Sequence, residues 1–483
     1  MAVELTLFGY ILLPLCVAAI LQPTWQIYLV LLTGAFGAAT PLAIGALGLP
    51  PGVPPAMLFL AYVGLQYLLG AKYPGDRRAW HMLEPFLLTV AYALVSAVLL
   101  PRLFAGSFNV WPQKPIPPFD IPVALVPGAG NVTQSLYLAI EACLLVGAAL
   151  FFTRATTDFA RLLNAYLLSG YVVVAICGWQ LANKITGIWY PERFLYSNPG
   201  WVLYPGQTVG FVPRINGPFS EPAALAFYLA GTIFCCTWLL LRGHRSRIAA
   251  LLLPLAITAL LLSTSTTGFT VLGIGAAMLA VYAVRGATRR VRLRIVLIAL
   301  PAAALFIGIA YGLSTLSARV EESVALVMRM TLNKAEGDSF QNRTSVDLDS
   351  LAVVLHSYGF GAGWGSVRAS SLIPGLLANL GIFGCALLAW FVVRLVRTVT
   401  RARRVAPSAG HLLALDGLSA AIIGHVSAGL ISGSALHALD FYVLVAALVA
   451  CAARVEIDVG QRRRQIQLAA LARTEVAPGP VAP

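Results

Sequence analysis

The chain has 483 residues, of which 59% are hydrophobic and only 11% are charged, and its mean hydropathy is +0.82. A water-soluble domain has about 25% charged residues, so these few charges cannot cover a surface that faces water. The formal net charge is +14. In a membrane protein the distribution of basic residues indicates the orientation of the helices. We therefore expect an integral membrane protein and no nucleic-acid partner.

Helices that cross a bilayer need about 20 mostly apolar residues. The sequence contains about thirteen segments that approach this length and composition. They cover residues 5–21, 26–48, 55–71, 83–101, 134–152, 160–181, 221–241, 248–263, 268–284, 293–313, 371–394, 412–433 and 438–453. We therefore expect an all-α fold, a polytopic transmembrane helical bundle of about 12–14 spans whose long periplasmic loops carry short helices. Residues 1–455 form its single transmembrane domain.

Lys and Arg residues are distributed unevenly between the two sides of this bundle. About two thirds of them fall in short connections on one side and in the tail, which is typical of the cytoplasmic side. The other side carries three long loops, at about 102–133, 182–220 and 314–370, which we expect to face the periplasm. Residues 456–483 are expected to form a short, disordered cytoplasmic tail.

The third long loop contains two short helical patterns. A hydrophobic repeat over 316–327 predicts an amphipathic helix on the membrane surface, or a packed loop helix. Thr344 and Asp347 have the spacing of a capping box, which predicts a second short helix that begins here and ends at Gly359.

The seven cysteines all lie in apolar stretches, and none forms a Cys-x-x-Cys pair. Cysteines in such surroundings behave as small apolar residues. We therefore expect neither disulfide bonds nor a metal site built on cysteine.

A candidate anion site lies where the second long loop enters a membrane helix. In this stretch Ser220 can cap a helix N-terminus, and Pro222 suits the first turn. The free N–H groups of a helix N-terminus and the forked guanidinium of Arg214 favour a phosphate or pyrophosphate. Asn216 is a candidate substrate-binding residue beside them. Alternatively, Arg214 faces lipid headgroups next to a capped helix.

Four glycines alternate with other residues over 359–365, shortly before Arg368. Glycine lets the backbone approach a ligand closely, and a sugar ring can stack on Trp364. Gly363, Trp364 and Ser370 are therefore candidate substrate-binding residues, and Arg368 is a candidate for binding a diphosphate. Alternatively, this segment is a tight re-entry loop, and the tryptophan is an interfacial anchor.

Titratable side chains in the third loop offer candidates for a general base. Asp349 and His356 follow Arg343 within one predicted short helix. Alternatively, each of these residues is solvated or caps a helix.

Three further ionisable residues lie in or next to apolar segments. Glu141 is inside an apolar run, where an ionisable group marks a functional site by default. His437 and Asp440 are spaced to share one helix face, either as functional groups or as a structural hydrogen-bonded pair.

Taken in order, these stretches resemble the O-antigen polymerase and ligase superfamily, membrane glycosyltransferases that use undecaprenyl-diphosphate-linked glycans. Residues 214–222 are similar to the family's Arg…Gly-x-Phe-x-x-Pro helix entry, and 263–268 to its Ser-x-Ser-Arg-x-Gly turn. Residues 342–384 are similar to its last large periplasmic loop, which ends in Gly-x-Gly-x-Gly and Leu-Ala-Asn-Leu-Gly-Ile-Phe-Gly. The hydropathy layout fits the family over most of the chain.

The chain departs from the family's pattern at two places. Threonine at 266–267 stands where the turn usually has an arginine, and serine at 370–371 stands where ligases have a His-Asn pair. The resemblance therefore implies a polymerase of repeat units, with Arg343 or Arg368 in place of the missing arginine.

The resemblance further implies a metal-independent, inverting glycosyl transfer that needs no cofactor. Arg214 and a second arginine would hold the donor diphosphate, and Glu221 is our first choice of base, followed by His356 and Asp349. The implied partners are an undecaprenyl-diphosphate-linked oligosaccharide, membrane lipids and a chain-length regulator protein, at the periplasmic face of the bacterial inner membrane. Two alternatives stay open: an O-antigen ligase, and a lipid-linked oligosaccharide transporter, which Glu141 would support.

Overall fold

The structure, a computed structural model, describes residues 3–45, 47–113, 121–201, 208–209, 212–284, 338–433 and 437–475, together with 290–291, 293–297, 300, 304 and 308. Its first elements are β1 (Val3–Leu5), α1 (Leu7–Ala18), α2 (Pro23–Thr33), β2 (Leu42–Ile44), β3 (Leu47–Gly48), α3 (Val53–Leu68), α4 (Asp76–Leu103), β4 (Asn109–Val110), β5 (Val123–Ala124), α5 (Ala129–Phe152), α6 (Phe159–Thr186) and α7 (Glu192–Leu195). They are followed by β6 (Thr208–Val209), β7 (Val212–Pro213), α8 (Pro222–Arg242), α9 (Arg247–Leu262), α10 (Thr266–Val284), α13 (Asp338–His356), α14 (Leu372–Val405), α15 (Ala409–Gly429) and α16 (Leu439–Glu475).

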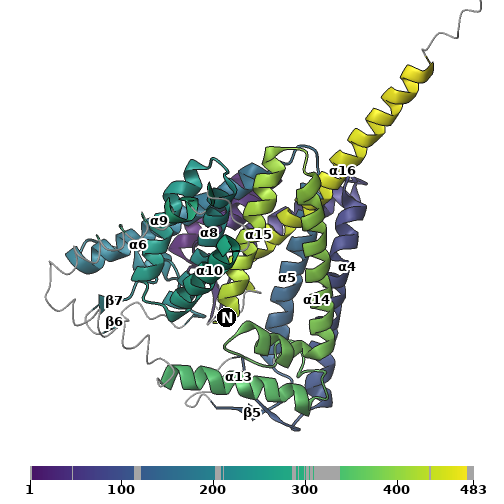
Figure 1. The fold of residues 1–483 in the computed structure, drawn as a ribbon. Helices are drawn as coiled ribbons and strands as arrows, with labels where there is room; N and C mark the ends of the chain where they lie inside the picture. The colour runs from purple at the N-terminus through teal and green to yellow at the C-terminus, as the bar shows by residue number, and fades with distance from the viewer. Residues whose placement is uncertain are drawn as a thin grey trace, which may run out of the picture.

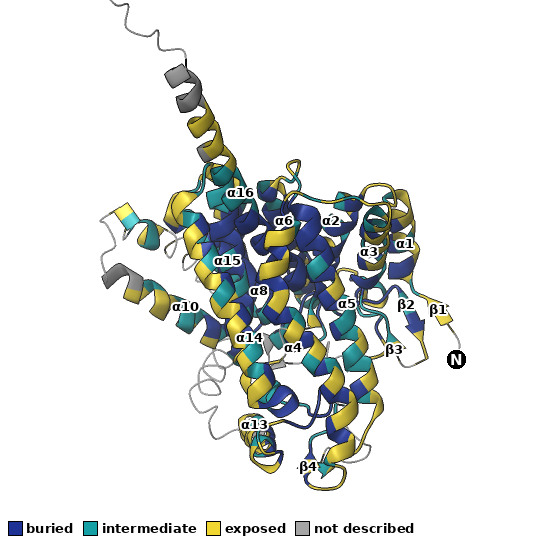
Figure 2. Ribbon diagram, turned by 90° about the vertical axis from the view of Figure 1, so that its right-hand side faces the viewer, coloured by how far each residue is buried: buried dark blue, intermediate teal, exposed yellow. Residues whose placement is uncertain are grey.

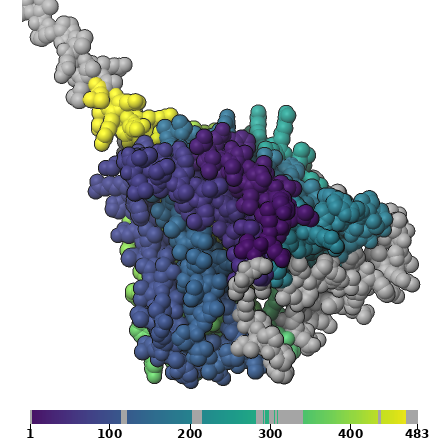
Figure 3. All heavy atoms as spheres, turned by 180° about the vertical axis from the view of Figure 1, so that it is seen from behind, coloured from purple at the N-terminus to yellow at the C-terminus, as the bar shows by residue number. Residues whose placement is uncertain are grey.

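The described part of the chain is mainly helical, which confirms the predicted all-α class. Within it, α4, α5, α6, α8, α14 and α15 are the six helices long and apolar enough to cross a membrane, and α1, α3, α9 and α10 are shorter apolar helices. The strands form three small antiparallel sheets, β1–β2–β3, β4–β5 and β6–β7. Figure 3 shows the N-terminal segments, in purple, covering part of one face beside the longer blue helices.

The first half of α16 lies at the centre of the bundle. Nearly every side chain from Phe441 to Val455 is buried, and the helix packs against α2, α4, α5, α6, α14 and α15. A helix that is apolar on all sides is suited to a protein core or to the interior of a membrane. Figure 1 shows this helix, in yellow, leaving the bundle beyond α15, and the buried residues in Figure 2 gather around its inner half.

Small residues allow α8 and α15 to pack closely. A side chain at Gly424 would clash with the carbonyl oxygen of Ala230, and one at Gly231 would clash with the ring of His425. His425 is fully buried, and its Nε2 lies 3.1 Å from the hydroxyl of Tyr166. This histidine therefore belongs to the contact between helices, where small residues permit close approach and polar side chains bond across it.

Two predicted spans near the N-terminus differ from the structure. Within 5–21 the helix is the 12-residue α1, and the segment 26–48 covers the end of the 11-residue α2 followed by β2 and β3. The length of the apolar run does not show this, because glycine at 34 and 37 and proline at 41 disfavour continuation of the helix without making the segment polar.

Two predictions about the last third of the chain also differ. The tail expected to be disordered is helical as far as Glu475, because the stretch after Gly460 contains helix formers and no proline before that residue. Thr344 lies inside α13 and does not begin a helix. The amphipathic helix predicted over 316–327 falls outside the described residues.

Candidate functional site

Arg214 follows β7 and lies on the path into α8. Its Nη2 donates a hydrogen bond to the carbonyl oxygen of Thr264 at 3.4 Å. Thr264 is in the turn between α9 and α10, and its φ is +47°. A β-branched residue with positive φ is strained, typically by about 1–3 kcal/mol. This turn is part of the segment 263–268, which resembles a family motif. Its strained residue, Thr264, is therefore the one whose carbonyl oxygen binds Arg214.

Arg343, in α13, is a second arginine whose charge acts on Arg214. Burial lowers the pKa of Arg214, the nearby Glu221 carboxylate raises it, and the positive charge of Arg343 lowers it again. The charges of Glu221 and Arg343 therefore both act on the guanidinium of Arg214. Nη1 of Arg343 donates to the hydroxyl of Ser432, after α15, at 3.0 Å. We call Arg214 and Arg343 the arginine pair.

Glu221 is the N-cap residue of α8, one position later than the predicted cap at Ser220. Its side chain makes no capping hydrogen bond, and Pro222 occupies the first turn. The carboxylate is partly buried and remains in the field of Arg214. The start of α8, with its partial positive charge, thus lies beside the arginine pair.

Gln180 of α6 holds the segment that carries Arg214. Its Oε1 accepts hydrogen bonds from the backbone N–H groups of Asn216, at 3.1 Å, and Gly217, at 2.8 Å. Its Nε2 donates to Oδ1 of Asn216 at 2.7 Å, and Nδ2 of Asn216 donates to the Phe219 carbonyl. Asn216 is only 2% exposed, so these contacts give it a role in positioning the loop. Gln180 was not singled out from the sequence, although an amide inside an apolar run indicates a buried hydrogen-bonding residue.

Asp347 connects α13 to the start of α14. Its Oδ1 accepts from the N–H groups of Ser370, at 2.7 Å, and Ser371, at 3.1 Å, and its Oδ2 accepts from the Ser371 hydroxyl at 2.7 Å. The Ser370 carbonyl in turn accepts from the N–H of Gly433 at 2.8 Å. The contacts at Ser370 therefore fix α13, and with it Arg343, relative to α14 and to the connection between α15 and α16.

The glycine-rich segment packs tightly against other parts of the protein. The four alternating glycines all have positive φ, and their neighbours along 361–367 are buried. A Cβ at Gly363 would lie 2.5 Å from the Ser96 carbonyl oxygen, and one at Gly361 would lie 2.7 Å from the backbone nitrogen of Gly381. Trp364 is 6% exposed, and its Nε1 donates to the Gln134 carbonyl at 3.1 Å. These contacts favour the interpretation as a tight re-entry loop.

Two buried asparagines hold this loop, and neither was singled out from the sequence. Nδ2 of Asn131, in α5, donates to the Trp364 carbonyl and to the Ser366 hydroxyl, both at 2.8 Å. Oδ1 of Asn379, in α14, accepts from the N–H groups of Ser366 and Val367, both at 3.1 Å. The loop's buried backbone groups thus find partners on two different helices.

The remaining candidates from the third loop lie against the β4–β5 hairpin. The guanidinium of Arg368 lies 5.8 Å from the ring of Trp111, whose Nε1 donates to Oδ2 of Asp349 at 2.9 Å. The ring of His356 stacks on Phe108 with centroids 6.0 Å apart. Two faces of α13 therefore carry different groups, with Arg343 on one and Asp349 and His356 on the other.

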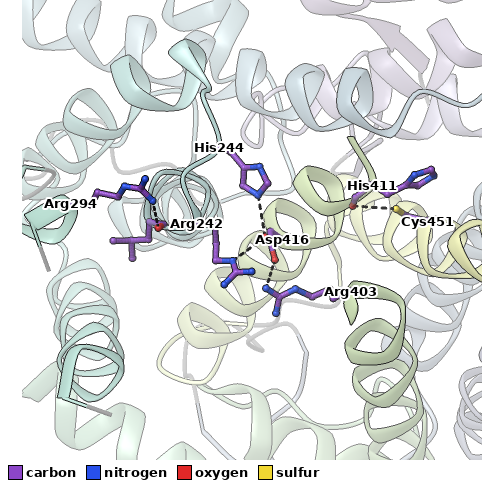
Figure 4. A network of polar contacts seen from close by, with 8 residues as sticks. Arg242, His244, Arg294, Arg403, His411, Asp416 and Cys451 are labelled. Carbon is purple, nitrogen blue, oxygen red and sulfur yellow. Dashed lines mark hydrogen bonds and ion pairs between the residues drawn. The ribbon is translucent and has the colours of Figure 1, made fainter. Parts of the chain in front are cut away.

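One buried carboxylate, that of Asp416, lies among basic side chains where α8, α14 and α15 meet (Figure 4). Asp416 of α15 is 2% exposed. Its carboxylate lies 2.6 Å from Nη2 of Arg403, 3.1 Å from Nε2 of His244 and 3.4 Å from Nε of Arg242. It thereby joins α15 to the last turns of α8 and α14.

Comparison of the chain with models of known protein families and with curated protein sequences finds no match.

Proposed function

We propose that the protein is a polymerase of undecaprenyl-diphosphate-linked polysaccharide repeat units, of the O-antigen or exopolysaccharide type. It works at the periplasmic face of the bacterial inner membrane, in a helical bundle whose C-terminus is cytoplasmic. The observation that carries this proposal is the arginine pair, because Arg214, at the entry to α8, and Arg343, in α13, are far apart in the sequence, and the positive charge of Arg343 acts on Arg214.

An anion between the two guanidinium groups would relieve their mutual repulsion. Like charges close together in a partly buried place are unfavourable, whereas a diphosphate would accept forked hydrogen bonds from both. The N-terminus of α8 adds partial positive charge at the same place. Of the two candidates for the second cation we choose Arg343, because its charge acts on Arg214. The guanidinium of Arg368 lies 5.8 Å from the ring of Trp111.

In the proposed reaction the acceptor hydroxyl attacks the anomeric carbon of the donor chain. The new bond forms between the acceptor oxygen and that carbon, and the bond from the carbon to the diphosphate oxygen breaks with its electron pair. Single displacement inverts the anomeric centre. The arginine pair stabilises the negative charge that develops on the leaving diphosphate, and a base, for which Glu221 is the sequence-based candidate, takes the hydroxyl proton.

The test is elongation by the purified, full-length protein in liposomes. The substrate is lipid-linked repeat unit extracted from a polymerase-deficient strain of the source bacterium, with no added metal or nucleotide sugar. We expect a ladder of repeats that disappears in Arg214→Ala and in Arg343→Ala at normal expression. Arg102→Ala, which removes an exposed arginine at the end of α4, should keep the ladder.

Other results would overturn the proposal. Transfer of the glycan to a lipid core without a ladder would indicate a ligase. Movement of the intact lipid-linked oligosaccharide across the vesicle membrane without any new glycosidic bond would indicate a transporter.

A further inference from the structure

A buried carboxylate in α5 has a histidine partner that the sequence did not pair with it. Glu141 is 2% exposed, and its Oε1 lies 3.5 Å from Nδ1 of His437. Tyr442 is a further polar neighbour of Glu141. The sequence offered His437 together with Asp440, but the structure connects His437 to a different helix. Burying an ionisable group at membrane depth costs free energy unless the group has a partner. Such a group is therefore a candidate for a functional role.

His437 is the accessible member of the pair. Its side chain is 34% exposed, whereas that of Glu141 is 3% exposed. The imidazole lies beside two aromatic rings, with centroid distances of 6.4 Å to Trp364 and 6.5 Å to Tyr137. If Nδ1 carries the proton that faces the carboxylate, Nε2 is left with a lone pair. A neutral imidazole oriented in this way by a buried carboxylate is the arrangement of a positioned general base.

The position of His437 relates it to the arginine pair. His437 lies on the connection between α15 and α16. The same connection carries Ser432, which accepts a hydrogen bond from Arg343, and Gly433, which donates to the Ser370 carbonyl. Ser432, which positions one arginine of the pair, and His437 are therefore five positions apart in the sequence, with 434–436 outside the described residues.

We propose that His437 is the general base of the glycosyl transfer and that Glu141 is its positioning residue. This inference rests on the proposed function. The acceptor oxygen bonds to the anomeric carbon, the diphosphate leaves with the electron pair of the broken bond, and Nε2 of His437 takes the hydroxyl proton. Glu141 holds the imidazole in place through its contact with Nδ1. Glu221 then belongs to the diphosphate end of the site, where its carboxylate lies in the field of Arg214.

The experiment uses the same liposome elongation assay and measures kcat and KM for the lipid-linked repeat unit. His437→Ala should lower kcat by about 100-fold or more, with little change in KM, because general-base catalysis contributes about 10²–10⁴-fold. Added imidazole should restore part of the lost rate. Glu141→Gln, which keeps the shape of the side chain, should lower kcat by at least about tenfold.

A second histidine-carboxylate pair provides the matched control. Nε2 of His411, in α15, lies 3.8 Å from Oδ2 of Asp458, in α16. His411→Asn should elongate at a rate near that of the wild type. Glu221→Gln distinguishes the two candidate bases, since it should retain more activity than His437→Ala and gain nothing from imidazole.

Each remaining outcome overturns the inference. A wild-type ladder that His437→Ala leaves unchanged would remove His437 from the chemistry while leaving the polymerase proposal intact. A loss in folded His437→Ala that imidazole does not rescue would assign the pair a structural role. A wild-type protein that forms no ladder would overturn the proposed function and this inference together.

Discussion

Replacing Asp416 tests whether its carboxylate holds the helix ends in Figure 4 together. Asp416→Asn keeps the volume of the side chain but removes the one negative charge among Arg242, His244 and Arg403. Breaking a buried ion pair costs about 3–5 kcal/mol, because the partner charge stays buried. Here the side chains of Arg242 and Arg403 are 42% and 31% exposed, so water screens them and moves the cost toward the surface value of about 0–1 kcal/mol. We expect an intermediate loss of about 2 kcal/mol.

Equilibrium unfolding in mixed SDS micelles measures this loss of unfolding free energy. The matched variant is Asp458→Asn, which removes a more exposed carboxylate that pairs with Arg454 at 3.0 Å within the same helix and lies 3.8 Å from Nε2 of His411. A pair of that kind contributes about 0.5 kcal/mol or less. Equal losses in the two variants would refute the reasoning, because burial of Asp416 is what separates them.

Three further predictions concern the loops around the candidate site. Gly361→Ala should lower the yield of folded protein in size-exclusion chromatography, because it adds a Cβ 2.7 Å from a backbone nitrogen of α14 and Gly361 has φ +84°. Gly178→Ala should keep the yield, because a Cβ at that position has nothing within 4 Å. Gln180→Leu should cost about 1–3 kcal/mol of unfolding free energy for each buried N–H it leaves unsatisfied, that of Asn216 included; an unchanged value would mean that the loop finds other acceptors. Thr264→Gly should leave the unfolding free energy unchanged or raise it by up to about 1 kcal/mol, because glycine tolerates positive φ. A loss there would show that the threonine side chain stabilises the turn.

The sequence was sufficient for features that depend on local chemistry. It placed Arg214 at the entry to a helix with Pro222 in the first turn, and α8 begins at Pro222. It also identified the alternating glycines as a segment that either approaches a ligand closely or forms a tight re-entry loop, and all four have positive φ. Whether such a loop approaches a ligand or its own protein depends on distant residues, which a local pattern does not contain.

Contacts between distant elements could not be predicted from one sequence. Gln180, Asn131 and Asn379 each stand inside a mostly apolar helix, and each satisfies loop backbone groups elsewhere in the chain. A polar amide inside an apolar helix signals that a partner exists, because an unsatisfied amide there is costly. It does not name the partner. For the same reason the sequence found Glu141 and His437 separately but did not pair them.

The anchoring of α13 has a consequence for how the protein can vary. The described contacts that position Arg343 run to Ser432, and from Asp347 to Ser370, which also receives Gly433. All of these partners follow α13 in the chain. A single residue inserted between Asp347 and Ser370 would therefore shift the register of this attachment and move the guanidinium of Arg343. As related chains diverge, we expect the length of this stretch to be kept.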